Sequence, residues 1–265
     1  MKISEIEQFF FDESKLEIFI SQLRRSFGIT GKDLKMYYNK FPVILQSILF
    51  PIILLFAFTM GRSIQPIYVV SGIMALVLFY SATAIAPITL PWETLFKTLE
   101  RTMTTPVSIK TILLGDIWAS FLYGTMISFV TFLLSIVAFS LWTSLNLLVL
   151  FLGIIVASFA FSCFSILLSV PPFSHPSAMM ILSITVKFPL VMISPLFIAI
   201  ESWPPSMVSP ITYFLDIVNF GLSGESAFGT FGLILDFGVL LVFGLGMLLI
   251  SFKLHEMTLQ KRFRN

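Results

Sequence analysis

The sequence has a single cysteine, Cys163, among its 265 residues, so no disulfide can form within the chain and no cysteine cluster can hold a metal. Charged residues are also scarce. Asp, Glu, Lys and Arg together make up 11% of the chain, whereas hydrophobic residues make up 57% and the mean hydropathy is +0.98. This composition excludes an ordinary water-soluble globular domain and is typical of a protein that crosses a membrane several times.

The motifs of several enzyme classes are absent as well. The phosphate-binding pattern G-x-x-x-x-G-K-[ST] does not occur, because the only Gly–Lys pair, Gly31–Lys32, is followed by Asp33. The patterns G-x-S-x-G and H-E-x-x-H are missing too. Gly115–Asp116 is similar to one half of an intramembrane aspartyl protease motif, but the Tyr–Asp half is missing. We therefore expect a protein that is not an enzyme and that binds no metal or cofactor of its own.

Six stretches of the sequence are apolar and long enough to cross a bilayer, which takes roughly 20 residues of helix. They are residues 42–60, 68–90, 109–141, 145–170, 178–200 and 231–252. Prolines should kink the helices inside these stretches, and they are Pro51, Pro87, Pro189 and Pro195. We predict an all-α polytopic membrane protein with six transmembrane helices in residues 42–252, an interfacial region in residues 1–41 and a basic tail in residues 253–265.

Basic residues are unevenly distributed between the two sides of these spans. Fourteen of the sixteen Lys and Arg residues precede the first span, follow the last span or lie between the second and third spans. The opposite side has Arg62 alone, and Lys187 falls within the fifth span. Because Lys and Arg concentrate on the cytoplasmic side of membrane proteins, we expect a multi-pass protein of the cell membrane with both termini in the cytoplasm.

The region of residues 1–41 has an amphipathic pattern. Five apolar residues recur at helical spacing on one face, and they are Leu16, Phe19, Ile20, Leu23 and Phe27. The other face carries Lys15, Glu17, Gln22 and Arg24. This pattern predicts an amphipathic helix on the inner surface of the membrane, although a helix packed on the periphery of the protein would have the same pattern. Gly28 and Gly31 are expected to end this helix before Lys32.

The most informative segment is residues 92–118, WETLFKTLERTMTTPVSIKTILLGDIW, here called the charged connection. Apolar stretches flank it, and its charged residues include Glu93, Lys97, Glu100, Arg101 and Lys110. If its first half forms a helix, the apolar residues lie on one face of that helix and the charged residues on the other. The apolar side consists of Leu95, Phe96, Leu99 and Met103. Glu93 and Lys97 have the i,i+4 spacing of an ion pair, and Ser108 should cap the next helix after Pro106. A short charged helix between two spans predicts a contact surface for a water-soluble partner.

The segment between the fifth and sixth spans, residues 201–230, contains no Lys or Arg. Ser209–Pro210 is a typical helix start, with a serine cap followed by proline in the first turn. The apolar stripe that follows consists of Ile211, Phe214, Leu215 and Val218, and the polar stripe consists of Thr212, Asp216 and Asn219. We predict a short amphipathic outer helix, at the surface or dipping into it.

Three charged residues lie inside the predicted spans, namely Asp116, Lys187 and Asp236. An unpaired charge in a bilayer core costs at least a few kcal/mol, so each should face protein or water. They are candidates for a polar translocation path or an intramembrane ion pair, with Asp116 and Lys187 as the leading pair. A static structural pair, or a lysine whose amine reaches the membrane surface, would explain the same residues without a role in transport.

Over nearly its whole length the chain resembles the permease subunits of type-2 ABC exporters. Residues 98–108 are similar to the cytoplasmic signature T-L-E-R-L-x-x-T-P of that family, with matches at Thr98, Leu99, Glu100, Arg101, Thr105 and Pro106. KDLK and two Phe–Pro pairs within residues 32–51 resemble the family's approach to its first span. Residues 209–216 resemble its outer N-P-L-T-Y segment. Lys97–Thr98 departs from the Lys–Gly pair that is usual at this point.

The resemblance implies an ABC transporter permease that dimerises with a second copy or a homologue and binds separate ABC ATP-binding subunits. These partner subunits, rather than this chain, would bind ATP and magnesium. The resemblance also implies a cytoplasmic coupling helix that contacts the ATPase through Glu93, Phe96, Lys97, Glu100, Arg101, Thr104, Thr105 and Pro106. The other expected partner is the lipid bilayer, and no nucleic acid partner is expected. Export, or efflux, is the direction of transport in that family, and no residue here selects a substrate.

Two other functional classes remain open from the residues alone. A stand-alone secondary transporter or channel could use Asp116, Lys187 and Asp236 for ion coupling. A membrane scaffold without transport activity is the third class. Copurification with a separate P-loop ATPase would favour the exporter over both.

Overall fold

The computed structural model describes residues 3–37, 40–105, 107–139, 145–171 and 176–264, and the regular structure in these ranges is entirely helical. The longer helices are α1 (Ile3–Tyr37), α4 (Pro66–Ala82), α5 (Ala86–Leu95), α7 (Ile109–Phe139), α8 (Leu147–Leu168), α9 (Pro176–Ile193), α10 (Pro210–Ser223) and α11 (Gly232–Arg264). Shorter elements are α2 (Phe41–Ile44), the π-helical η1 (Leu45–Leu49), α3 (Phe50–Thr59), α6 (Thr98–Met103) and the 3-10 turns η2 (Ile200–Ser202), η3 (Pro204–Val208) and η4 (Gly229–Phe231).

Within the described ranges, four helical stretches have the length and apolar composition of membrane spans. They are Pro66–Leu95, Ile109–Phe139, Leu147–Leu168 and Gly229–Thr258. They coincide with four of the six predicted spans, so the all-α fold is confirmed and a membrane protein is supported. The remaining two predicted spans contain shorter apolar helices, Leu45–Thr59 and Ser177–Ile193. By length and composition alone, the described helices therefore support four crossings.

Two predicted spans differ in detail from the observed helices. The second is interrupted, because the three residues after Ala82 form a turn before α5 begins with Pro87 in its first turn. Proline is favoured there because it lacks the N–H that a first-turn residue leaves unpaired. The fifth ends early, at Ile193, so Pro195 lies beyond the helix rather than inside it.

The buried core of the bundle is built around α4. Every residue from Val70 to Ala82 is buried, and α4 packs against α7, α8 and α10. The ring of Phe79 is fully buried, and its centroid lies 5.1 Å from that of Phe161 in α8. α4 and α7 approach closely because Gly124 has no side chain, and a Cβ there would lie 2.9 Å from the Cα of Ala82. This central helix therefore meets protein on most of its surface.

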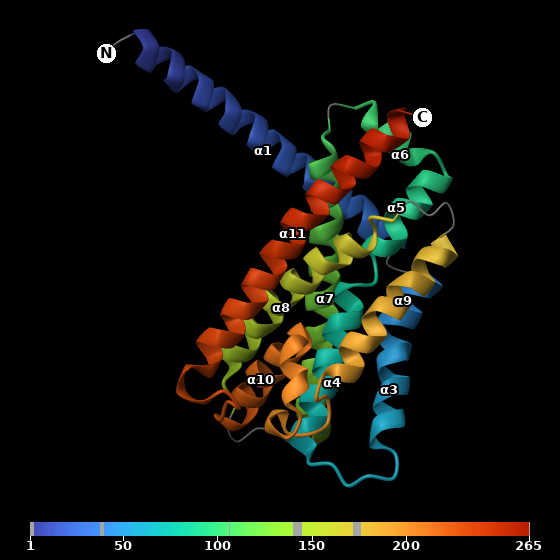
Figure 1. Ribbon diagram of the computed structural model, residues 1–265, viewed down its shortest axis with the longest axis vertical. Coiled ribbons are helices and arrows are strands. Elements are labelled where there is room, and N and C mark those ends of the chain that lie inside the picture. The colour runs from blue at the N-terminus through green and yellow to red at the C-terminus, as the bar shows by residue number, and fades with distance from the viewer. Residues whose placement is uncertain (1–2, 38–39, 106, 140–144, 172–175, 265) are drawn as a thin grey trace.

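α1 is one continuous helix, and its first half extends away from the bundle (Figure 1). The prediction that Gly28 and Gly31 end it was wrong. Two glycines cost about 1 kcal/mol each relative to alanine, and contact of α1 with α7 offsets that cost. The side that packs is mostly polar, with buried residues at helical spacing that are Ser26, Thr30, Asp33 and Tyr37. Ile20 and Phe27, from the predicted apolar face, are 55% and 50% exposed.

The two ends of the bundle are formed by different elements (Figure 1). One end, here called the connection end, has α6, the last turns of α11 and the part of α1 that packs on α7. The other end, here called the α10 end, has α10, the turn after α3 and the start of α4. The segments that carry most of the basic residues in the sequence therefore gather at one end.

α10 begins as the sequence predicted, because the Ser209 side chain accepts a hydrogen bond from the backbone N–H of Ile211 and Pro210 lies in the first turn. The helix ends at Gly224, whose φ of +80° is left-handed and favours glycine. It lies deeper than a surface helix. Thr212 and Asp216 of the predicted polar stripe are fully buried, because α10 packs against α4, α8 and α11.

Candidate functional site

The charged connection forms the last turn of α5, the whole of α6 and the start of α7. α5 ends at Leu95, and the chain then turns at Lys97, which has a left-handed φ of 55°. Thr98 starts α6, and its hydroxyl donates to the carbonyl oxygen of Glu93 at 3.2 Å. Leu95 and Phe96 are 47% and 62% exposed. Apolar side chains of this turn therefore face away from the bundle.

Glu93 is buried rather than exposed, contrary to the sequence prediction. It is 4% exposed, and it pairs with Lys32 of α1 instead of Lys97. The turn at Lys97 ends the helix before the i,i+4 pair can share a face. The single amphipathic helix predicted for this segment was therefore wrong, and two short helices replace it with Glu93 inside and Phe96 outside.

The remaining residues predicted to contact an ATP-binding subunit are exposed where the structure describes them. They are Phe96, Lys97, Arg101, Thr104 and Thr105. The side chain of Glu100 and the whole of Pro106 lie outside the described residues. α6 and its two flanking turns thus present two cationic side chains, two hydroxyls and one aromatic ring to the surroundings. The predicted cap of the next helix is confirmed, since Ser108 Oγ accepts from the N–H of Thr111 at 3.2 Å.

Lys32 joins α1 to the charged connection. Its amine donates a hydrogen bond to Glu93 Oε1 and lies 3.2 Å from Asp33 Oδ1. Burial alone would lower the pKa of Lys32, but the Asp33 and Glu93 carboxylates outweigh this effect and raise its pKa above the ordinary value. The ammonium therefore stays charged at physiological pH, and it ties two helices together.

Hydrogen bonds between uncharged groups fix α1 on α7. The hydroxyl of Thr30 donates to the carbonyl oxygen of Gly115 at 3.0 Å, and Gln22 Oε1 accepts from the hydroxyl of Thr111 at 2.6 Å. The helices approach this closely because a Cβ on Gly115 would lie 2.6 Å from Ile29 Cγ2. Gly115 thus has a packing role. α1, the charged connection and α7 form one bonded unit at the connection end.

Asp116 contacts Asp33 of α1, a partner that the sequence did not indicate. Both carboxyl groups are buried, and they interact electrostatically with each other. Within the described ranges, neither oxygen of Asp33 accepts a hydrogen bond from an N–H donor or a hydroxyl group. Two carboxyl groups therefore share a buried site beside Lys32.

Lys187 is fully buried in α9 and reaches the break between α4 and α5. Its amine donates to the carbonyl oxygen of Thr83 at 2.7 Å and to Gln46 Oε1 of η1 at 3.3 Å. In an unbroken helix the residue four positions after Thr83 would donate to this carbonyl, but that residue is Pro87, which has no N–H. The Lys187 amine replaces the missing donor, and its positive charge also suits the carboxyl end of α4.

The predicted ion pair between Asp116 and Lys187 is not formed. In the part of the chain that the structure describes, the ion pairs join Lys32 to Asp33 and Glu93, and Lys110 to Glu256. Because Pro87 has no N–H, the carbonyl oxygen of Thr83 is available to Lys187 as an uncharged partner. α1, which the prediction placed on the membrane surface, supplies the partner of Asp116.

Asp236 is buried near the start of α11, where its carboxyl group interacts electrostatically with that of Asp216 in α10. Asp216 also accepts from Ser226 Oγ at 2.5 Å and from the N–H of Ala227 at 2.9 Å. Among the residues described, neither oxygen of Asp236 accepts a hydrogen bond from an N–H or a hydroxyl group. Asp116, Lys187 and Asp236 therefore have three separate sets of partners.

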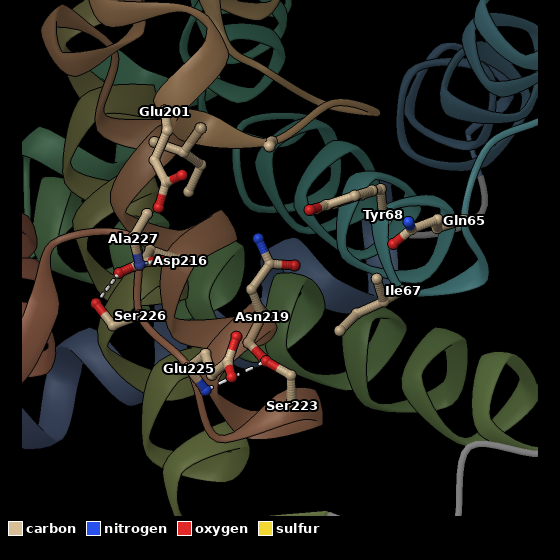
Figure 2. Close-up of a pocket in the computed structure, with 12 residues that line it drawn as sticks. Gln65, Ile67, Tyr68, Glu201, Asp216, Asn219, Ser223, Glu225, Ser226 and Ala227 are labelled. Carbon is tan, nitrogen blue, oxygen red and sulfur yellow. Dashed lines mark hydrogen bonds between the residues drawn. The ribbon is translucent and has the colours of Figure 1, made fainter.

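A cavity of about 320 Å³ lies beside Asp216 at the α10 end (Figure 2). The start of α4, η2, α10 and the loop after α10 line it, and its polar side chains include Gln65, Tyr68, Glu201, Asp216, Asn219 and Glu225. Figure 2 shows the Tyr68 hydroxyl and the Asn219 amide directed toward the middle of the cavity from different helices. The sequence indicated Asp216 and Asn219 only as members of a polar stripe.

Comparison with known proteins adds no assignment, because no protein-family model and no curated protein matches this sequence. Function is therefore inferred from the residues and their geometry. Sequence reasoning missed Asp33 and Gln46 as partners of predicted site residues. Asp33 could have been found from the polar stripe of α1 at helical spacing. The position of Pro87, four residues after Thr83, could have indicated a carbonyl in need of a donor.

Proposed function

We propose that this chain is the transmembrane permease subunit of an ATP-driven ABC exporter, forming the substrate path as a dimer and driven by separate ATP-binding subunits. The observation that carries the proposal is the charged connection, which exposes Phe96, Lys97 and Arg101 on a short helical segment between two apolar helices. The chain has no P-loop pattern, so the energy of transport would come from another subunit. The similarity of residues 98–108 to the exporter signature supports the same role.

Six crossings fit this role. The helical stretch Phe41–Thr59 is continuous through α2, η1 and α3, and α9 has 18 residues. At 1.5 Å per residue these helices are about 28 and 27 Å long, close to the roughly 30 Å of a hydrocarbon core. With the four longer helices they would place α6 and both termini on one side. The excess of Lys and Arg in these segments makes that side the cytoplasm.

α1 would lie on the inner surface of the membrane and take part in coupling. Its exposed Ile20 and Phe27 would face lipid, as in other interfacial helices. The ion pair between Lys32 and Glu93 and the hydrogen bond from Thr30 to α7 link this helix to the charged connection. A force applied by an ATPase to Phe96 or Arg101 would therefore move α1, α5 and α7 together.

Copurification tests the proposal. The tagged chain, isolated from its native membranes in a mild detergent, should bring with it a P-loop ATPase identified by mass spectrometry. Lys97→Glu combined with Arg101→Glu should release this ATPase, because both side chains are exposed on the contact surface. Lys253→Glu, a charge reversal at an exposed lysine of α11, should retain it. Absence of any P-loop protein, or full retention by the double variant, would contradict the proposal.

A proton-coupled secondary transporter is the second candidate, and the buried carboxyl pairs favour it. Asp116 lies beside Asp33 and Asp236 beside Asp216, and intramembrane carboxyl groups of this kind form the proton relays of many transporters. The purified chain in liposomes, without any ATPase, should then move protons in response to a pH gradient, measured with an enclosed pH-sensitive dye. Asp116→Asn and Asp236→Asn should abolish this flux. No flux above that of empty liposomes would exclude this candidate.

A further inference from the structure

The cavity of about 320 Å³ at the α10 end has many hydrogen-bond acceptors, and no Lys, Arg or His is among the described residues that line it. Glu201, Asp216 and Glu225 each bring a carboxylate. The volume lies at the lower end of the range for small-molecule sites. A lining of this kind repels anions, and it favours a small ligand that carries positive charge and donates hydrogen bonds.

Asn219 supplies an acceptor that the protein leaves unused. Its Oδ1 is buried and has no hydrogen-bond partner among the described groups. Figure 2 shows the amide directed into the cavity, with the Tyr68 hydroxyl facing the same space from α4. A buried polar atom without a partner carries a free-energy penalty. A slight rotation of the amide would present Oδ1 to the cavity, and a ligand N–H that reached it there would remove this penalty.

A second carboxyl group lies next to Asp216. Asp216 is held in place by Ser226 and the backbone N–H of Ala227, and Asp236 lies behind it with no exposed surface. Neither oxygen of Asp236 has an N–H or hydroxyl donor from the described chain. A cation in the cavity would interact favourably with this pair of carboxyl groups.

We propose that this cavity binds the primary ammonium group of an organic amine. Glu201 and Glu225 attract the charge at the rim, while Asn219 Oδ1 and the Tyr68 hydroxyl oxygen accept N–H hydrogen bonds. A metal ion is a poorer fit, since no group of three or more His, Cys, Asp or Glu in the described ranges is placed to hold one. A primary ammonium has three N–H donors, which suits acceptors spread over several elements.

A neighbouring cavity does not share the acidic lining of the proposed amine site. It has about 260 Å³, and it is lined by Arg62, Trp203 and apolar residues of α9 and the following turn, with no acidic side chain among its described lining. That cavity lacks the carboxylates that an ammonium needs. The proposed amine site is independent of the exporter role, because binding requires only the folded chain.

Calorimetric titration of the full chain in phosphatidylcholine nanodiscs tests the site. The probe is 1,4-diaminobutane, and 1,4-butanediol serves as its uncharged counterpart of the same length. We expect the diamine to bind and the diol to bind at least about tenfold more weakly, because only the diamine has the charge that the carboxylates attract. No binding of the diamine, or equal binding of both compounds, would overturn the proposal, and equal binding would instead indicate a polyol site.

Two variants test whether the amine binds within this cavity. Glu201→Gln removes one exposed rim charge, and Asn219→Leu removes the unused acceptor with little change in volume. Each should weaken diamine binding at least about threefold. Glu17→Gln removes the same charge from an exposed position on α1 and should leave binding unchanged. Unaltered binding in both cavity variants would overturn the assignment, as would an equal loss in Glu17→Gln.

Discussion

The two ends of the bundle use charge in different ways. At the connection end lysines meet acids, with Lys32 bonded to Glu93 and Lys110 at 2.8 Å from Glu256. At the α10 end no ion pair occurs among the described residues, and Asp216 is held by uncharged donors of the following loop. Charges at the connection end join helices to one another, whereas those at the α10 end face each other and a cavity. Under the proposed function, the first arrangement would let an ATPase move several helices together.

The contrast between the two ends requires that they lie on opposite sides of the membrane. After replacement of Cys163, cysteines placed at Arg62 and Glu225 should react completely with a membrane-impermeant thiol reagent added to intact cells. A cysteine at Thr104 of the charged connection should not react. All three positions are exposed in the structure, so burial does not account for a difference. Labelling of Thr104 in intact cells, equal to that of Glu225, would contradict the proposed orientation.

Loss of Lys32 should have the largest effect on stability. Lys32→Met leaves the buried Glu93 without its partner, and we expect a loss of about 2 to 3 kcal/mol in the free energy of unfolding. This value is below the full cost of breaking a buried pair, because Lys32 itself is partly exposed. Unfolding in mixed micelles measures it. Lys253→Met, at an exposed lysine of α11, should change stability by less than about 0.5 kcal/mol.

The pH dependence of this effect sharpens the same test. The pKa of Lys32 is raised above its ordinary value of 10.5, so its contribution is complete below pH 10.5 and is lost as the pH rises through the folded-state pKa. The stability difference between the native chain and Lys32→Met should therefore not fall between about pH 7 and about pH 10. A steady fall across this window would show that Lys32 is not held by the carboxylates.

Loss of Lys187 should have the next largest effect. Lys187→Met leaves the Thr83 carbonyl and Gln46 without a donor, at a cost of about 1 to 3 kcal/mol. Because Asp116 has other partners, combining this change with Asp116→Asn should give additive losses within about 0.5 kcal/mol. Unfolding of the two single variants and the double variant measures this. A coupling energy above about 1 kcal/mol would restore the direct pair that the sequence suggested.

Loss of the α10 cap should have a smaller effect. Ser209→Ala removes the acceptor of the Ile211 N–H and one partner of Ser194, so we expect a loss of about 1 kcal/mol. Ser209→Asp keeps an acceptor and should recover part of it. Thermal unfolding followed by tryptophan fluorescence provides the measurement. No change in Ser209→Ala would show that packing alone fixes the start of α10.

Local signals in the sequence were enough to predict much of the fold. Four of the six long apolar runs, the Ser209–Pro210 start and the Ser108 cap were found where expected, because they depend on residues close in the chain. Propensity misled at Gly28 and Gly31, because packing of α1 on α7 outweighs the local cost of glycine. The turn at Lys97 was missed for a similar reason, since a non-glycine residue rarely adopts a positive φ.

The partners of the charged residues could not be predicted from local pattern. Asp33 meets Asp116, and Lys32 meets Glu93, only because α1 folds back onto α5 and α7. The partner of Lys187 depends on the break between α4 and α5. The uniformly apolar composition of this stretch does not indicate that break. Pairing across helices is set by the packing of the whole bundle, and a single sequence gives its composition but not its packing.

Site-specific photo-crosslinking tests the central claim most directly. A photoreactive amino acid replaces Phe96, which is 62% exposed at the charged connection, and in a separate variant Met207, which is 49% exposed at the α10 end. Irradiation of intact cells, followed by mass spectrometry, should join position 96 but not position 207 to a P-loop ATPase. A crosslink from neither position, or from position 207 alone, would contradict the proposal that a separate ATPase binds the charged connection.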